Sequence, residues 1–322
     1  MNTNKVLDAL IGMAVGDALG VPVEFLSREL LRNSPVVEMT GYGTHNQPAG
    51  TWSDDSSLAF CLAESLCEGY DVDKIAKNFL KWYQENHWTP HGKVFDIGVA
   101  TSQALRRVRD GVNPLVAGGV TEYDNGNGSL MRILPLAFYI QNMPIDERFE
   151  LIAKTSSITH GHIRSINSCF IYIEYVLELL KGINKMDAFK NMQKTVNAFY
   201  KEYSICSEHE ISKFHRILEN PIGDYNIYPI YEYPENEIRS SGYVLHTLEA
   251  SFWCFLKSMN YAEAVQKAVN LGEDTDTTGC VTGGLAGIYY GIESIPAHWV
   301  EALARKNDIF SLAEKLSKAT QK

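Results

Sequence analysis

This 322-residue sequence lacks the cysteine patterns, apolar runs and leader segment that mark several protein classes. None of its six cysteines forms a CxxC pair, so we expect free, mostly buried thiols in a reducing cytoplasm rather than a zinc ribbon or a disulfide framework. No uninterrupted apolar run reaches about 18 residues, and the N-terminus has no basic start typical of a signal peptide. These absences predict a cytoplasmic protein without a membrane span.

Basic charge is also scarce. The net charge is −10, the isoelectric point is about 5.4, and no long block of Lys and Arg occurs. Proteins that bind nucleic acid through a general electrostatic footprint carry clustered positive charge, so we expect no direct nucleic-acid partner. Nothing in the sequence indicates an oligomer, and a monomer is the default expectation.

Convincing strands are nearly absent as well, whereas helical periodicity is present along the whole chain. Apolar residues recur at helical spacing from the first helix, near residue 6, to the last, near residue 305. Asp71 is expected to cap the helix whose apolar stripe begins at Ile75. The best strand candidate, YNIYPIYEY, contains Pro229 and is read as a loop. We therefore predict one compact all-α domain over residues 1–322. Residues 204–238 are the most polar section and are interpreted as an insertion or lid.

The first helix carries an unusual set of small residues. Gly12, Gly16 and Gly20 alternate with Ala14 and Ala18. Glycine at helical spacing removes the side chains that normally separate two helices. This pattern indicates that another backbone approaches the first helix closely.

Two acidic clusters stand at predicted helix starts. The first is Ser53, Asp54 and Asp55 in GTWSDDSSLAF, and the second is LGEDTDTTGC, with Asp274 and Asp276. Each cluster alone fits a helix cap with acids in the first turn. Together they offer carboxylate and hydroxyl oxygens that suit hard cations such as Mg²⁺, Mn²⁺ or Ca²⁺. An EF-hand is excluded because Leu285 falls where the bidentate Glu is required.

Three further segments contain candidate binding residues. The glycines of GNGSLMRILPLAF precede a predicted helix opened by Ser129, where backbone N–H groups can hold a phosphate, but residue 131 is Met, so no dinucleotide fingerprint is present. The pair His160 and His162 is read as a helix-boundary feature, without the further ligands of a zinc site. Asp96 can cap a helix or receive a cationic substrate group, and Glu24 is either a surface acid or a site acid.

Taken in order, these segments resemble the ADP-ribosylglycohydrolase family, which includes the dinitrogenase reductase-activating glycohydrolase and the ADP-ribosyl-acceptor hydrolases. The matching segments are GMAVGDALGVPVEF, GTWSDDSSLAF, DIGVATSQAL, GNGSLMRILPLAF, THGHIRS, SGYVLHTLEASFW and GEDTDTTGCVTGGLAGIYYG. The resemblance implies an all-α orthogonal helical bundle with two divalent cations, Mg²⁺ or Mn²⁺.

The resemblance also implies roles for individual residues. The implied metal ligands are Ser53, Asp54, Asp55, Asp274, Asp276 and Thr277. The residues implied to bind ADP-ribose are Gly126, Asn127, Gly128, Ser129, His160 and Tyr243, the last of which would line the substrate cleft. The implied catalytic acids are Asp55, Asp274, Asp96 and Glu24, and Asp96 matches the acid that faces the guanidinium in arginine-directed members. Ser53 stands where the family often has Thr.

The expected activity is therefore metal-dependent removal of ADP-ribose from protein, most simply by cleavage of its N-glycosidic bond to arginine. One alternative is hydrolysis of O-linked ADP-ribose, attached to serine or a small metabolite. A second is a non-catalytic ADP-ribose-binding protein, and a third is a helical protein stabilised by Ca²⁺. The role of Glu273 is open between a solvent-facing acid and a residue that supports the metal site.

Overall fold

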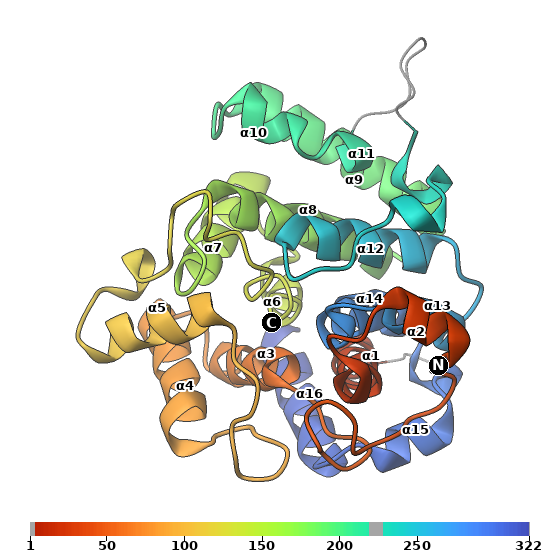
Figure 1. The fold of residues 1–322 in the computed structure, drawn as a ribbon. Coiled ribbons are helices and arrows are strands. Elements are labelled where there is room, and N and C mark those ends of the chain that lie inside the picture. The colour runs from red at the N-terminus through yellow and green to blue at the C-terminus, as the bar shows by residue number, and fades with distance from the viewer. Residues whose placement is uncertain (1–3, 219–227, 322) are drawn as a thin grey trace.

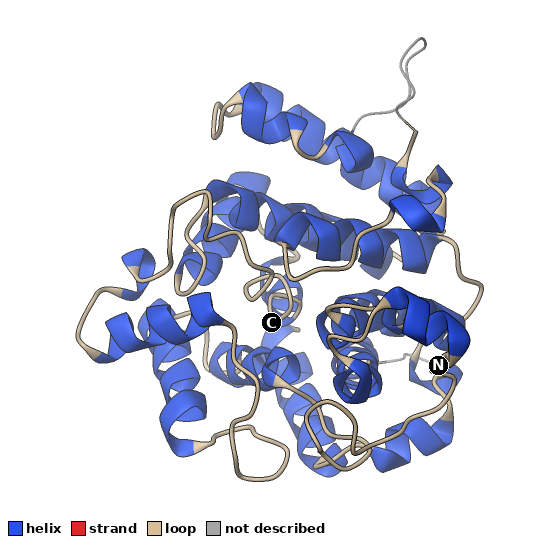
Figure 2. Ribbon diagram, viewed as in Figure 1, coloured by secondary structure: helices blue, strands red, loops and turns tan. Residues whose placement is uncertain are grey.

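The computed structural model of the protein describes residues 4–218 and 228–321. Within these residues the chain forms helices and loops and contains no β-strand, as Figure 2 shows, so the all-α prediction is confirmed. The α-helices are α1 (Lys5–Gly20), α2 (Arg28–Asn33), α3 (Asp54–Leu66), α4 (Val72–Glu85), α5 (Val99–Arg109), α6 (Pro135–Ile140), α7 (Ile145–Ser157), α8 (Ile163–Leu180), α9 (Lys185–Glu202), α10 (Glu208–Ser212), α11 (His215–Leu218), α12 (Val244–Leu256), α13 (Tyr261–Val269), α14 (Thr275–Tyr290), α15 (Ala297–Ala302) and α16 (Lys306–Thr320).

Helices α1 and α14 lie side by side near the middle of the molecule (Figure 1). Their contact is made by backbone, because a Cβ atom built on Gly16 would lie only 2.1 Å from the Gly279 carbonyl oxygen, and one on Gly283 would lie 2.3 Å from that of Gly12. At the end of α1, a Cβ on Gly20 would lie 2.4 Å from the Cα of Asp276. The small-residue stripe therefore fixes the first turn of α14 against the end of α1.

One stretch is more apolar than the sequence analysis recognised. Residues Lys5–Val23 are long and apolar enough to cross a membrane by length and composition, with a mean hydropathy of 1.7. In the structure 89% of that stretch is buried. Its partner is α14, so the apolar surface of α1 is explained by its place at the centre of the fold.

Two local predictions need correction. The helix expected from Ser129 begins only at Pro135, and residues 129–132 form turns. Proline fits the first turn of a helix because its missing N–H has no intrahelical partner there, whereas further inside it would remove a hydrogen bond. Asp96 does not cap α5, because the cap position is Gly98 and Asp96 lies two residues earlier with a φ of 47°.

Other local predictions hold. Asp71 caps α4 through hydrogen bonds from Asp73 N and Lys74 N. The described part of YNIYPIYEY, residues 228–233, contains a short 3₁₀ turn rather than a strand, and residues 225–227 lie outside the described residues. All six cysteines are free, and four are buried.

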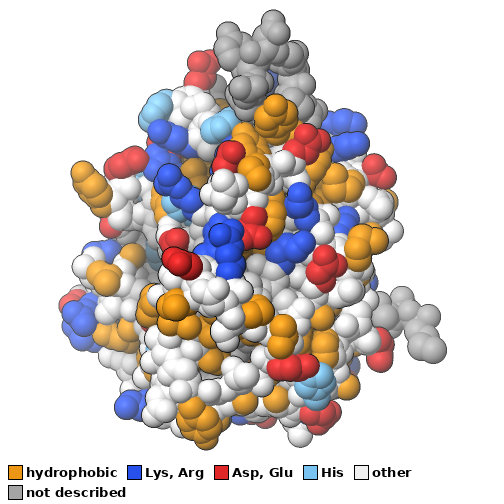
Figure 3. Space-filling model, turned by 45° about the vertical axis from the view of Figure 1, so that its right-hand side comes forward, with side chains coloured by type: hydrophobic (Ala, Val, Ile, Leu, Met, Phe, Trp, Pro, Cys, Tyr) orange, Lys and Arg blue, Asp and Glu red, His pale blue; other side chains and the backbone are white. Residues whose placement is uncertain are grey.

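The surface drawn in Figure 3 mixes both signs of charge. Lys and Arg side chains alternate there with Asp and Glu, and hydrophobic side chains lie scattered among them. Helices α10 and α11, within the predicted insertion, lie outside α9 (Figure 1). Two buried or half-buried arginines connect this segment to the rest of the fold, because Arg164 is paired with Glu210 at 2.8 Å and Arg216 with Glu249 at 2.7 Å.

Candidate active site

The two acidic clusters meet where α3 and α14 begin. Ser53 Oγ donates a hydrogen bond to Asp55 Oδ2 at 2.8 Å, and Thr277 Oγ1 donates to the same oxygen at 3.4 Å. Asp55 and Thr277 are 222 positions apart in the chain. The predicted half-sites are therefore brought together by the packing of α1, α3 and α14.

Three buried carboxylate oxygens of the acidic cluster lack a hydrogen-bond partner among the described residues. Among the described residues, no donor reaches Asp55 Oδ1, Asp274 Oδ1 or Asp276 Oδ2, although all three atoms are buried. A buried carboxylate oxygen without a partner is costly, and a bound cation removes that cost. Because every donor atom here is oxygen, the set fits a hard divalent cation such as Mg²⁺ or Mn²⁺.

The ionisation of the cluster supports the same conclusion. Burial raises the pKa of Asp54, Asp55 and Asp276 well above the ordinary value for aspartate. Neighbouring carboxylates add to the effect, and the strongest repulsion comes from Asp96 at Asp54 and from Asp17 at Asp55. So many like charges cannot ionise together at low cost unless a positive charge enters the site.

Asp17 belongs to this cluster, and the sequence analysis missed it. It extends from α1 and accepts hydrogen bonds from Ser53 N at 2.9 Å, Ser56 N at 3.0 Å and Ser56 Oγ at 2.6 Å. One carboxylate oxygen lies within 4.8 Å of oxygens from Asp55 and Asp276. Burial raises the pKa of Asp17 to about 6. In the sequence, Asp17 could have been recognised as the one acid among the small residues from Gly12 to Gly20, in a helix expected to be buried.

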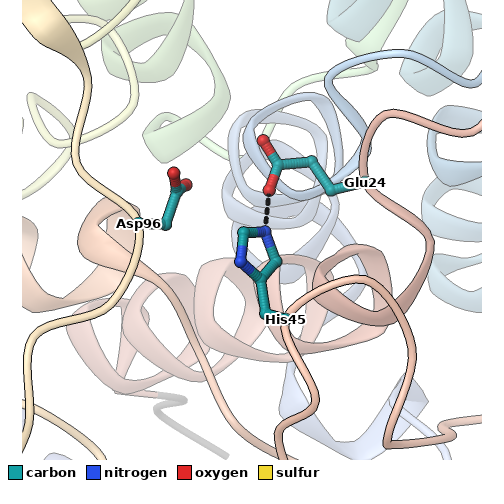
Figure 4. Close-up of side chains that lie close together, drawn as sticks. All are labelled: Glu24, His45 and Asp96. Carbon is teal, nitrogen blue, oxygen red and sulfur yellow. Dashed lines mark hydrogen bonds and ion pairs between the residues drawn. The ribbon is translucent and has the colours of Figure 1, made fainter.

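A second acidic group adjoins the first. Glu24, His45 and Asp96 come from three separate loops and point toward one another (Figure 4). The Nε2 atom of His45 is hydrogen-bonded to Glu24 Oε2, and one atom from each of the three side chains lies within 4.8 Å of the others. Another such grouping contains Glu24, Asp274 and Asp276, so Glu24 joins the two groups.

Of the two readings of Glu24, the structure favours a site acid over a surface acid, because its side chain is buried. That burial raises its pKa to about 7, which the hydrogen bond from His45 partly offsets. Burial also raises the pKa of Asp96. His45 itself was not found by the sequence analysis, because the segment between α2 and α3 has no periodic pattern.

The glycine segment lies directly beside the acidic cluster. Asn127 Nδ2 donates to Asp274 Oδ2 at 2.8 Å, and Asn127 N donates to Gly242 O at 3.0 Å. The expected helix start is absent here, so the helix dipole cannot contribute to anion binding at Ser129. The remaining basis for phosphate binding is the run of backbone N–H groups in a turn.

His160 forms the wall behind this glycine segment. A Cβ built on Gly128 would lie 2.7 Å from His160 Cε1, and one on Gly126 would lie 3.3 Å from Nε2. The other ring nitrogen, Nδ1, is hydrogen-bonded to Thr159 Oγ1 at 2.8 Å. Burial lowers the pKa of His160 to about 3, so the imidazole is neutral at physiological pH. Any side chain at Gly128 would collide with the ring, and one at Gly126 would make a tight contact with it.

His162 faces a different environment from His160. It caps α8 through its Nδ1 atom, which accepts from Arg164 N at 3.2 Å, and it lies near Glu122 and Glu210. Tyr243 lies close to Arg164, because its hydroxyl oxygen accepts a hydrogen bond from Arg164 Nη1 at 3.1 Å. The HxH pair therefore does not converge on one metal position among the residues described.

Glu273 and Ser129 differ in their exposure. Glu273 is exposed, and its backbone has a φ of 61° and exchanges hydrogen bonds with Phe25 N and Leu26 O. Its side chain thus corresponds to the solvent-facing alternative.

Ser129, in the glycine segment, is fully buried, and its hydroxyl accepts a hydrogen bond from Ser156 Oγ at 2.9 Å.

The chain is similar to known proteins along most of its length. The family profile described as ADP-ribosylglycohydrolase matches residues 2–322. The chain is 32% identical over 319 residues to the ADP-ribosylarginine hydrolase Tri1 of Pseudomonas putida, covering 97% of this chain and 78% of that protein. It is 27% identical over 308 residues to the ADP-ribosyl-[dinitrogen reductase] glycohydrolase of Rhodospirillum rubrum, covering 94% and 91%. A solved structure of an ADP-ribosylglycohydrolase-related protein complex aligns with a TM-score of 0.80 and 33% identity over 98% of each chain.

Proposed function

Because this chain belongs to the ADP-ribosylglycohydrolase family, and is therefore an enzyme that releases ADP-ribose, we propose that it cleaves the N-glycosidic bond between ADP-ribose and an arginine side chain of a protein. The observation that carries the proposal is the contact between the glycine segment and the acidic cluster, made by Asn127 and Asp274 at 2.8 Å. This contact brings the glycine segment, the proposed phosphate-binding turn, beside carboxylates with buried oxygens that lack a hydrogen-bond partner among the described residues. An anionic, ribose-containing substrate satisfies both.

The residues proposed to hold two Mg²⁺ or Mn²⁺ ions are Ser53, Asp54, Asp55, Asp274, Asp276 and Thr277. When bound, such cations neutralise the carboxylates, bind vicinal hydroxyls of the ribose and polarise water. The buried orphan oxygens of Asp55, Asp274 and Asp276 support this set. Asp17 would support these ligands indirectly, because the three hydrogen bonds that it accepts hold the chain at Ser53 and Ser56 in place.

The substrate would lie along the glycine segment. Gly126, Asn127, Gly128 and Ser129 would bind the diphosphate, with the neutral His160 ring behind them and Tyr243 beside them. The backbone N–H groups of Gly126, Gly128 and Ser129 would be the donors, because the Asn127 N–H already donates to Gly242 O. No charged donor is needed from His160, in keeping with its lowered pKa. This placement would orient the anomeric carbon of the distal ribose toward the acidic cluster.

Bond cleavage would use the remaining carboxylates. Asp55 or Asp274 would orient the attacking water, and Asp96 or Glu24 would assist the leaving group, through a transition state with oxocarbenium character. A pKa of about 7 lets Glu24 carry a proton near neutral pH and donate it to a departing nitrogen. Asp96 would face the guanidinium and pair with its planar N–H groups.

Residues 204–238 are proposed to be an insertion that helps to select the acceptor within a single domain. The supporting contact is the ion pair of Arg164 and Glu210 at 2.8 Å. Arg164 also donates to the Tyr243 hydroxyl, so the insertion is connected to the substrate side of the site.

The test measures release of free ADP-ribose from arginine-linked and serine-linked peptides, with Mg²⁺, with Mn²⁺ and in EDTA. We expect turnover of the arginine-linked peptide that requires a cation. An Asp54→Asn/Asp276→Asn double variant should lose it, and Asp96→Ala should impair the arginine linkage only. Full turnover in EDTA or by the double variant would refute the metal mechanism.

Other outcomes identify the alternatives. Turnover of serine-linked peptide alone would indicate an O-linked ADP-ribose hydrolase. Tight binding of ADP-ribose without turnover on any linkage would indicate a non-catalytic binder. Cation-dependent melting without nucleotide binding would indicate a structural Ca²⁺ site.

A further inference from the structure

His45 occupies a position that no sequence motif accounts for. It lies in the loop between α2 and α3, and only 16% of its side chain is exposed. Its ring packs between two aromatic rings, with centroid distances of 6.0 Å to Phe25 and 5.4 Å to Phe95. Its Nε2 atom binds one oxygen of Glu24, and Figure 4 shows the second oxygen of Glu24 pointing away from the ring.

We propose that His45 is a positioning residue that holds Glu24 for the leaving group and, with Asp96, completes a subsite for the planar cationic side chain of the acceptor. The inference rests on the proposed function, because it concerns the acceptor side of the same reaction. It assigns to His45 an effect that is exerted through Glu24.

The first argument is geometric. Glu24 has oxygens near Asp274 and Asp276 on one side and near Asp96 on the other. With no fixed partner, the Glu24 side chain would be free to turn toward either set of acids. The hydrogen bond from His45 opposes that movement and fixes one carboxylate oxygen, so the other is left available to a substrate.

The second argument is backbone strain around His45. Phe25 has a φ of 66° and Asp96 a φ of 47°, and neither is glycine. Such conformations cost about 1–3 kcal/mol each and persist only where surrounding contacts impose them, most often at functional sites. At Phe25 the constraint is a hydrogen bond from its N–H to Glu273 O at 2.7 Å. The loop that carries Glu24 and Phe25 is thus held in place by a tertiary contact.

The third argument concerns the chemistry of the acceptor. Two carboxylates and the face of an exposed aromatic ring recognise a guanidinium well, because it is planar, carries five N–H donors and stacks on aromatic faces. Phe25 is 67% exposed, and its ring lies 6.0 Å from that of His45, which is hydrogen-bonded to Glu24. A serine hydroxyl offers neither the charge nor the plane that these groups match.

The experiment compares His45→Phe with His45→Gln. Phenylalanine keeps an aromatic ring but loses the N–H, whereas the glutamine amide retains a donor that can reach Glu24. We expect His45→Phe to lower kcat on the arginine-linked peptide by about 10- to 100-fold, as for other residues that orient a catalytic group. His45→Gln should recover most of that loss. Binding of free ADP-ribose should be unchanged in both variants, because the glycine segment holds it.

A matched control is available at His87. Its Nε2 atom is hydrogen-bonded to Glu64 Oε2 at 2.7 Å, so it makes the same type of pair outside the proposed site. His87→Gln should leave kcat and ADP-ribose binding at their wild-type values. Should His45→Phe fold poorly, a His45→Ala variant should be rescued by added imidazole, which a purely structural role would not predict.

The outcomes separate this inference from the function on which it rests. Failure of the wild-type enzyme on the arginine-linked peptide would refute the proposed function and the inference together. Wild-type turnover with an unaltered kcat in His45→Phe would refute the inference alone. Equal losses of kcat and ADP-ribose binding in His45→Phe, without imidazole rescue of His45→Ala, would also refute it, because the effect would then be structural.

Discussion

Without bound cations, the folded protein should become less stable as the pH rises. Burial raises the pKa of Asp17 to about 6 and of Glu24 to about 7, and it raises the pKa of Asp54, Asp55 and Asp276 well above the ordinary value. In the unfolded chain these groups titrate near pH 4. The metal-free folded state therefore binds more protons, and the associated stability is complete below about pH 4 and is lost as the pH rises through the folded pKa values.

Two histidines act in the opposite direction at lower pH. Burial lowers the pKa of His160 to about 3 and that of His246 to about 4. Between those values and about pH 6.5 the unfolded chain binds the extra protons, so these residues make stability rise with pH. Above about pH 6.5 they are neutral in both states. The hydrogen bond with Glu24 raises the pKa of His45, so the stability that this histidine contributes is lost with rising pH, as it is for the carboxylates. The window from about pH 6.5 to 8 thus reports on the carboxylates and His45.

The expected size of the stability loss follows from proton linkage. One proton retained by the folded state across 1.5 pH units corresponds to about 2 kcal/mol of lost stability, at about 1.36 kcal/mol per unit. An unfolding entropy of about 2.1 cal/mol/K per residue gives about 0.7 kcal/mol/K for this chain of 322 residues. Each retained proton should therefore lower Tm by about 3 °C between pH 6.5 and 8. A cation at about 100 times its Kd should add about 2.7 kcal/mol, or about 4 °C.

The assay is thermal melting at several pH values in EDTA and in excess Mg²⁺ or Mn²⁺. We expect Tm in EDTA to fall from pH 6.5 to 8 and the gain from the cation to grow over the same range, because the ion requires deprotonated ligands. An Asp55→Asn/Asp276→Asn variant should show a smaller slope and no cation gain. A Tm in EDTA that stays constant or rises, or a cation gain that is equal at pH 6.5 and pH 8, would contradict the reasoning.

Three further predictions test other parts of the structure. Gly16→Ala should lower the free energy of unfolding in urea by about 1–3 kcal/mol, because its Cβ would lie 2.1 Å from a backbone oxygen of α14. Gly98→Ala is the control, since its Cβ would lie 3.8 Å from the nearest atom and little change is expected. Gly128→Ala should weaken ADP-ribose binding in calorimetry by displacing the turn from His160, and an unchanged affinity would count against the phosphate-binding role. Asp17→Ala should remove the cation-dependent gain in Tm, because the backbone at the start of α3 loses its acceptor.

The sequence by itself determined the helices and the chemistry of their ends. Periodicity predicted α1, α3 and α14, and the Asp71 cap was found because capping is an interaction between residues two or three positions apart. The residue types at Ser53–Asp55 and Asp274–Thr277 indicated oxygen ligands for the same local reason. Where a local rule was misapplied, at Ser129, Pro135 sets the helix start instead.

Tertiary structure alone decided which of these local features meet. The starts of α3 and α14 converge because glycines let the backbones of α1 and α14 touch, a contact between residues more than 250 positions apart. Asp17 joins the cluster because α1 also packs against the start of α3, and His45 reaches Glu24 only through loops without periodicity. Burial, which sets the pKa values of these acids, depends on everything packed around them. A sequence pattern can name the side chains that favour a cation, but the three-dimensional packing decides which of their oxygens remain unpaired.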